Sequence, residues 1–299
     1  GFEAAEGQSS GWSGEPIRFP RIQGADVCGH IDAVGEGVSA ERIGERVIVD
    51  GWLRDAEHPE DVERAGYLGS ERDGGFAEYV TVPAENAHAI DSDLSDAELA
   101  SFPCAWATAE NLVSRPYVGA GDTVLITGAS GGVGSAAIQL CKRRGATVVA
   151  LSSAAKHPAL RELGADAVID RSSEDLAGDV SSALGRAGVN VVLDPVCGAR
   201  FGELIGLLRR EGRYASCGAI AGPIVTFDAR HLIYRDLEFH GATVLPPSVF
   251  ANLVGYIERG EVRPVVSRRF PLSQLREAQE AFLARKDVGK IVIDVTEES

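Results

Sequence analysis

Methionine is entirely absent from the 299 residues, and the chain begins with Gly1 where an initiator methionine is usual. We therefore expect an N-terminal segment to be missing and methionines to have been left out, so that some residues adjacent here are separated in the natural chain. The opening residues are small and polar, without the apolar core of a secretory signal peptide. No apolar run approaches the roughly 18 residues of a membrane span, so we expect no membrane association.

Cysteine and basic residues are also scarce. The five cysteines are far apart and form no CxxC pair, which argues against a disulfide framework and favours a reduced, cytoplasmic location. Lys and Arg number 29 against 44 Asp and Glu, which gives a net charge of −15. A chain this acidic is a poor ligand for nucleic acid or anionic lipid, so we expect a small-molecule substrate.

Apolar strands and helices alternate through the middle of the chain. The runs TVLIT (123–127), TVVAL (147–151) and VNVVLD (189–194) read as buried strands. This alternation predicts an α/β fold with a doubly wound parallel sheet. Further strands are expected at 167–170, 213–217 and 237–241, and helices at 158–163 and 201–209.

The flanking segments are expected to be mostly strand and loop. Short β-type runs occupy 46–50 and 76–83, and the polar stretch 51–73 reads as a long surface loop. Towards the C-terminus we expect helices at 248–258 and 272–284 and a last strand at 290–295.

The strongest local pattern is TVLITGASGGVG at residues 123–134. Gly128, Gly131 and Gly134 follow an expected strand and open an expected helix. Glycine lets the backbone turn tightly and approach a pyrophosphate, and a helix N-terminus offers free N–H groups and the positive end of the helix dipole. The strand–turn–helix–strand context favours a dinucleotide-binding loop over a glycine-rich turn without a ligand.

The end of the next strand bears on the choice of cofactor. NAD-binding folds usually place an acidic residue there to bind the ribose 2′-hydroxyl. This chain has Ser152 and Ser153, followed by Lys156. A carboxylate would repel a 2′-phosphate, whereas hydroxyl and ammonium groups can bind it, so we expect NADP(H). The alternative for Lys156 is a solvated surface lysine.

Several further segments complete a family pattern: GADVCGHIDAVGEGV, GERVIV, GGFAEYVTVP, FPCAWATA, LGADAVID, VVLDPVCG and GKIVIDV. In this order, over nearly the whole chain, they resemble medium-chain dehydrogenases/reductases of the quinone oxidoreductase-like branch. The resemblance implies a GroES-like, mainly β catalytic domain at 1–106 and 248–299, with its N-terminal part missing. It implies a Rossmann dinucleotide-binding domain at 107–247. We also expect a homodimer or homotetramer.

The resemblance allows the zinc site to be compared residue by residue. Where zinc alcohol dehydrogenases of this family carry Gly-His-Glu, this chain has Gly24-Ala25-Asp26, so Ala25 replaces the histidine ligand. Cys104 matches a later zinc cysteine, but catalytic zinc needs three protein ligands. Residues 51–73 hold no cysteine, so the structural zinc lobe is missing too. We expect no bound metal, and a Cys104 that is a small buried residue beside the nicotinamide pocket.

The same resemblance places Thr108 and Val133 at the nicotinamide end of the cofactor. Asp26, Trp52 and Trp106 are pocket candidates, although core packing is an equally good interpretation of both tryptophans. Tyr79 is expected to be structural. The residues expected to act in catalysis are Thr108, Asp26 and Trp106. The expected cofactor contacts are Gly128, Ala129, Ser130, Gly131, Gly132, Val133, Gly134, Ser152, Ser153, Lys156, Arg171, Val196, Gly218, Ala219 and Ile220.

Without zinc, no Lewis acid lowers the pKa of an alcohol. The expected chemistry is therefore hydride transfer from NADPH to an acceptor that is already electrophilic, a quinone or an α,β-unsaturated carbonyl. Two alternatives stay open: a zinc-type alcohol or aldehyde dehydrogenase of the same family, and a low-turnover NADPH-binding protein. The sequence identifies no proton donor.

Overall fold

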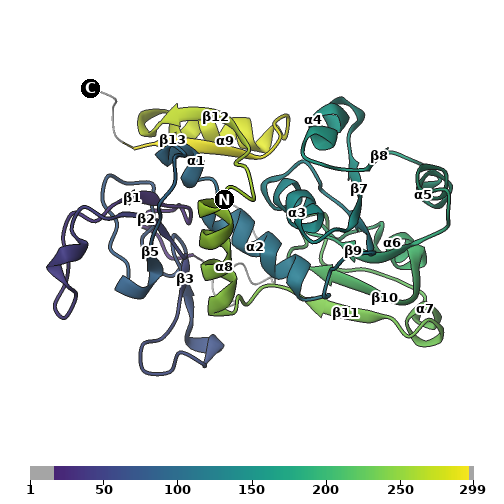
Figure 1. Ribbon diagram of the computed structural model, residues 1–299, viewed down its shortest axis with the longest axis horizontal. Helices are drawn as coiled ribbons and strands as arrows, with labels where there is room; N and C mark the ends of the chain where they lie inside the picture. The colour runs from purple at the N-terminus through teal and green to yellow at the C-terminus, as the bar shows by residue number, and fades with distance from the viewer. Residues whose placement is uncertain (1–16, 296–299) are drawn as a thin grey trace.

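A computed structural model describes residues 17–295. Figure 1 shows a lobe of short strands on one side and a larger sheet flanked by helices on the other, with α2 (Pro103–Ser114) and α8 (Pro247–Glu258) between them. Phe102, Trp106 and Phe250 are fully buried in the apolar cluster that joins these central helices to the sheet. Among the described residues, no helix is long and apolar enough to cross a membrane.

The larger sheet has six strands, all parallel, in the order β11-β10-β9-β6-β7-β8. This confirms the predicted doubly wound fold, and the buried apolar strands follow from helices covering both faces. The winding reverses between β6 and β9, and ligands in such folds bind beyond the carboxyl ends of the strands at this switch point. The strands are β6 (Thr123–Ile126), β7 (Thr147–Ser152), β8 (Ala167–Asp170), β9 (Val189–Leu193), β10 (Leu208–Ser216) and β11 (Glu238–Gly241).

Five helices accompany this sheet in addition to α2 and α8. Two of them, spanning Leu176–Leu184 and Ala229–Tyr234, were not predicted. The first begins after Asp175, which accepts a hydrogen bond from Gly178 N, and ends at Gly185 in the left-handed conformation. The five are α3 (Gly132–Arg143), α4 (His157–Glu162), α5 (Leu176–Leu184), α6 (Phe201–Leu207) and α7 (Ala229–Tyr234).

The other lobe is built from small sheets. Strands β1, β2 and β5 form an antiparallel sheet, β3 pairs with β4, and β12 pairs in parallel with β13. The strand predicted at 76–83 is wrong, because this run pairs with no strand in the described part of the chain. Tyr79 within it is 73% exposed. The elements are β1 (Cys28–His30), β2 (Arg46–Val49), β3 (Trp52–Leu53), β4 (Gly66–Tyr67), β5 (Ala87–Ala89), α1 (Asp96–Leu99), β12 (Val266–Pro271), α9 (Leu275–Leu283) and β13 (Lys290–Asp294).

The C-terminal segment returns to the glycine-rich loop. Gly289 N donates to Ser130 O at 2.9 Å, and Gly289 forms an isolated parallel bridge with Gly131. Gly289 has a φ of 82°, and a Cβ there would lie 2.2 Å from Val265 O, so the crossing requires glycine. The crossing places the next residue, Lys290, over the start of α3.

Candidate active site

The loop after β6 forms a backbone cradle at the N-terminus of α3. Gly128 has a φ of 54°, and a Cβ there would lie 2.8 Å from Val196 Cγ1. A Cβ on Gly134 would lie 2.4 Å from the Gly128 carbonyl oxygen. Gly131 is the N-cap and has no side chain to occupy the free N–H groups of the first helical turn. These features fit the diphosphate of a dinucleotide. The other residues predicted for this loop, Ala129, Ser130, Gly132 and Val133, lie in the same turn.

The carboxyl ends of β7 and β8 come together beside this loop. Ser152 ends β7 and is buried, and its carbonyl accepts a hydrogen bond from Arg171 N at 2.9 Å. Asp170, which ends β8, accepts a hydrogen bond from Ala154 N at 3.1 Å, next to the predicted Ser153. Hydrogen bonds from Ser172 lower the pKa of Asp170. The sequence did not point to this carboxylate, because the family pattern places the ribose-binding acid at the end of β7, whereas Asp170 ends β8.

The Lys156 ammonium is hydrogen-bonded to three oxygen atoms of the protein. Its Nζ donates to Ser130 Oγ at 3.2 Å and to the carbonyls of Arg285 and Asp287, each at 2.9 Å. The alternative of a solvated lysine is therefore wrong, because the side chain ties the cofactor loop to the C-terminal segment. Burial and the nearby charge of Arg171 lower the pKa of Lys156. Within residues 17–295 no hydrogen bond or ion pair engages the Arg171 guanidinium, which leaves it available to a ligand.

Asp194, directly after β9, organises the loop that follows this strand at the switch point. It has 0% exposure, and Thr127 Oγ1 and Tyr214 OH donate to its carboxylate, the latter at 2.9 Å. The backbone N–H groups of Val196 and Cys197 donate to it at 3.2 and 3.0 Å. The carboxylate therefore fixes the loop that packs on Gly128.

The loop after β10 lies against the Val196 loop. Ala221 N donates to Val196 O at 2.9 Å, and a Cβ on Gly218 would lie 2.8 Å from Pro195 O. The predicted Ala219 and Ile220 belong to this loop, and both are exposed. The structure therefore brings the two predicted backbone segments to one edge of the sheet.

Two predicted residues, Cys104 and Thr108, lie on the partly exposed face of α2. Between residues 101 and 113, every residue is buried except Cys104 and Thr108, which lie one helical turn apart. Trp106 is only 2% exposed and packs on Phe102 with ring centroids 4.9 Å apart. The structure therefore corrects the prediction that Trp106 is a catalytic pocket residue, because its ring is part of the core. Trp52 is likewise buried.

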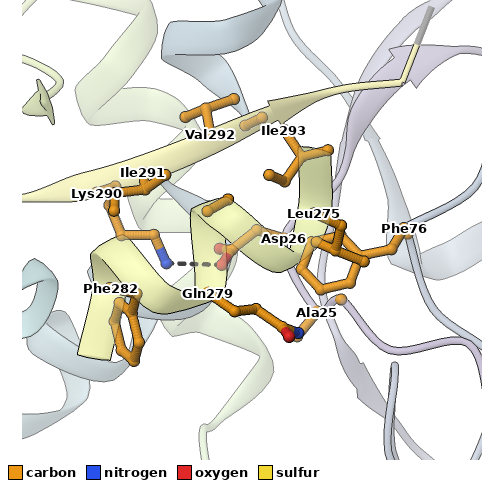
Figure 2. A pocket seen from close by; sticks show the side chains of 14 residues that line it. Ala25, Asp26, Phe76, Leu275, Gln279, Phe282, Lys290, Ile291, Val292 and Ile293 are labelled. Carbon is orange, nitrogen blue, oxygen red and sulfur yellow. Dashed lines mark hydrogen bonds and ion pairs between the residues drawn. The ribbon is translucent and has the colours of Figure 1, made fainter. Parts of the chain in front are cut away.

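An ion pair links Asp26 to Lys290 across 264 positions of sequence (Figure 2). Lys290 Nζ donates to Asp26 Oδ2 at 2.7 Å, and Cys104 N donates to Asp26 Oδ1 at 2.6 Å. The pair lies in the wall of a cavity of about 260 Å³ whose other walls are largely apolar side chains of α9 and β13. Lys290 was missed from the sequence, because nothing near it in the chain suggested its partner.

Lys290 also reaches the cofactor loop. A Cβ on Gly132 would lie 2.8 Å from Lys290 Cδ, so the lysine stem crosses the first turn of α3. Burial alone would lower the pKa of Lys290, but the charges of Asp26 and Cys104 and the hydrogen bond to Asp26 raise it above its ordinary value. The ammonium is therefore a fixed positive charge beside the predicted diphosphate site.

The described residues do not fit a catalytic zinc ion. Both oxygens of Asp26 are engaged, one by Lys290 and one by Cys104 N. Ala25 offers no ligand atom, and burial followed by the charge of Asp26 raises the pKa of the Cys104 thiol, which disfavours the thiolate that binds zinc. In residues 17–295, no three His, Cys, Asp or Glu side chains are grouped to hold a metal.

Known proteins match both lobes of this chain. The family model for the alcohol dehydrogenase GroES-like domain matches residues 5–92, and that for zinc-binding dehydrogenases matches residues 132–259. The alcohol dehydrogenase notN of Aspergillus sp. is 32% identical to this chain, over 92% of the chain and 82% of its own length. The chain belongs to the zinc-type alcohol dehydrogenase family. It is thus a medium-chain dehydrogenase/reductase, as the sequence segments predicted.

Solved structures of this family share the fold. One from Sinorhizobium meliloti 1021, provisionally named an alcohol dehydrogenase, is 47% identical with a TM-score of 0.87, over 93% of this chain and 77% of its own. The 2-octenoyl-CoA carboxylase reductase CinF, solved with NADP and 2-octenoyl-CoA, is 31% identical with a TM-score of 0.84, over 91% of this chain and 68% of its own. As a member of this oxidoreductase family, the chain acts on a small molecule with a nicotinamide cofactor.

Proposed function

We propose that this protein is an NADPH-dependent reductase that delivers hydride to an α,β-unsaturated carbonyl or a quinone without catalytic zinc. The observation that carries the proposal is the Asp26–Lys290 ion pair next to Ala25. The pair lies next to Ala25, which stands where zinc-dependent relatives carry a histidine ligand, and it occupies the Asp26 carboxylate. CinF supports the substrate class, since 2-octenoyl-CoA is an α,β-unsaturated thioester.

The residues of this chain have mainly positioning roles in such a reaction. The N–H groups of the glycine-rich loop and the Lys290 ammonium bind the cofactor diphosphate, and Asp26 holds that ammonium in place. Thr108 and the Val196 loop hold the nicotinamide, which supplies the hydride when it is bound. Orientation of two reactants in a closed site contributes a large share of the rate of such transfers.

A substrate screen tests the proposal. The purified protein is mixed with NADPH and a panel of enones, enoyl thioesters, quinones, aldehydes and ketones, and the loss of NADPH absorbance is followed. We expect turnover with enones, enoyl thioesters or quinones, and little with simple aldehydes and ketones. Turnover confined to the interconversion of alcohols and aldehydes would contradict it. Tight NADPH binding without turnover on any panel member would favour a binding protein instead.

Metal analysis gives an independent prediction. Because the described residues assemble no three-ligand set, we expect no stoichiometric zinc in protein purified with zinc in the medium. Elemental analysis of the protein before and after dialysis against a chelator measures this. About one zinc per chain that resists the chelator, together with activity that depends on it, would contradict the zinc-free mechanism.

Cofactor preference is expected to depend on Arg171 and Ser152. A charge-assisted contact contributes about 1.5–3 kcal/mol, so Arg171→Ala should weaken NADPH binding by about tenfold or more and leave NADH binding nearly unchanged. Ser152→Asp should reverse the preference, because its carboxylate would repel a 2′-phosphate and bind a 2′-hydroxyl. The matched control is Arg161→Ala on the exposed surface of α4, which removes the same charge. Equal affinities of the parent protein for both cofactors, measured by fluorescence titration, would show that these residues do not select the phosphate.

A further inference from the structure

Tyr67, in β4, has its hydroxyl beside the backbone of Ala25. Strand β4 is anchored by its pairing with β3, in which Trp52 stands opposite Tyr67. The two rings meet edge to face with centroids 5.7 Å apart, and Tyr67 N donates to Glu71 Oε2 at 2.8 Å. A Cβ on Gly51 would lie 3.3 Å from Tyr67 Cζ, 3.5 Å from Tyr67 Oη and 3.3 Å from Ala25 O, so glycine leaves room for the ring and the hydroxyl lies close to Ala25. These contacts fix the direction of the Tyr67 hydroxyl.

Two side chains from different elements influence the Cys104 thiol. Burial raises the pKa of this thiol, and Tyr67 and Thr108 both lower it against that larger effect. The Tyr67 hydroxyl lies beside the Ala25 backbone, and the next residue, Asp26, accepts a hydrogen bond from Cys104 N at 2.6 Å, which brings the hydroxyl to the start of α2. Cys104 and Thr108 are the residues of α2 that keep some exposure between positions 101 and 113, and Tyr67 is also only partly buried. A small molecule beside Thr108 can therefore reach the same hydroxyls.

Tyr67 is held in its neutral form. Burial, the neighbouring Cys104 and the carboxylates of Asp26 and Asp50 all raise the pKa of the phenol far above its ordinary value. The group is thus a poor base and does not release its proton to water, but it stays a hydrogen-bond donor at every pH at which the enzyme would work. A neutral donor in a partly water-excluded site is suited to an oxygen that gains negative charge during reaction.

We propose that the Tyr67 hydroxyl donates a hydrogen bond to the substrate carbonyl oxygen and stabilises the enolate formed by hydride addition. This role rests on the proposed function. The β-carbon gains the hydride, the electron pair of the C=C bond moves to the carbonyl oxygen, and water then protonates the α-carbon. The products are the saturated carbonyl compound and the oxidised cofactor. Tyr67 keeps its proton throughout, and Thr108 stays beside it at the nicotinamide.

Tyr67→Phe tests this role, because it removes the hydroxyl and keeps the ring. The loss of a single oxyanion donor typically lowers kcat by about 100-fold or more, and we expect a fall of that size with the best enone. The dissociation constant of NADPH and the melting temperature should stay close to those of the parent. Tyr79→Phe is the control: it deletes the same group from a phenol that is 73% exposed, and should keep parental activity. A Tyr67→Phe enzyme that keeps kcat within about threefold would overturn the proposal.

A spectroscopic measurement tests the same role without turnover. Ionisation of a tyrosine raises absorbance near 295 nm, so the difference between parent and Tyr67→Phe follows Tyr67 alone. We expect this difference to stay flat up to about pH 10, the ordinary tyrosine pKa. A rise well below that pH would show an ionised phenol that cannot donate, and would overturn the proposal.

The design separates failure of this inference from failure of the proposed function. If the parent protein reduces only aldehydes or ketones, the proposed substrate class is wrong. The carbonyl oxygen still becomes an oxyanion in that reduction, so we expect Tyr67→Phe to lower kcat there as well. If the parent is active on either class of substrate and the Tyr67→Phe variant is equally active, only the proposed role of Tyr67 is excluded.

Discussion

Replacing Gly134 with alanine is expected to weaken NADPH binding by about 100-fold or more. The new Cβ would lie 2.4 Å from the Gly128 carbonyl oxygen and 2.6 Å from Ala129 Cα, both of them backbone atoms. The helix start and the loop must therefore move apart, and the loop N–H groups lose their common direction. Charge-assisted hydrogen bonds to a phosphate are worth about 1.5–3 kcal/mol each, so losing two of them accounts for this factor.

Gly29→Ala is the matched control, because a Cβ on Gly29 would meet nothing within 4 Å. Affinity is measured by titrating the fluorescence of bound NADPH, and folding by circular dichroism at 222 nm. Gly134→Ala should keep its helical signal while losing the cofactor. Parental NADPH affinity in a folded Gly134→Ala protein would mean that the cofactor does not depend on this cradle.

The sheet could be predicted because the hydrophobic pattern of each strand is visible in its own residues. Runs such as TVLIT and VNVVLD are apolar on both faces, and only a strand covered by helices on both sides suits that pattern. By contrast, 76–83 is rich in the aromatic and β-branched residues that favour strands, but within residues 17–295 it pairs with no strand. Residue preference therefore predicts the conformation that a segment can adopt, while pairing decides whether a strand forms.

The site was predictable where its residues lie close together in sequence. The conformation of the glycine-rich loop depends mostly on its own residues, since Gly128 and Gly134 approach each other within this one turn. Lys290 and Asp26 are brought together only by the return of the C-terminal segment. Lys156 likewise bonds to carbonyls 129 and 131 positions away, so a local pattern suggested its charge but not its partners.

The largest loss of stability from a single polar change is expected for Asp194→Ala. The carboxylate has 0% exposure and accepts hydrogen bonds from two hydroxyl groups and two backbone N–H groups. Removing it leaves these donors buried without acceptors, and each such group costs about 1–3 kcal/mol. We expect the free energy of unfolding to fall by at least about 3 kcal/mol, as measured by urea denaturation.

Tyr214→Phe provides the comparison for Asp194→Ala. It deletes one of the donors and leaves the carboxylate with Thr127 and the N–H groups of Val196 and Cys197, so the cost should be about 1 kcal/mol. Asp194→Ala should also weaken NADPH binding, because the Val196 loop that packs on Gly128 loses its anchor, whereas Tyr214→Phe should leave that binding nearly unchanged. Equal effects of the two substitutions on unfolding and on cofactor affinity would mean that the buried carboxylate does not hold the loop, and that packing of Val196 against Gly128 is enough to position it.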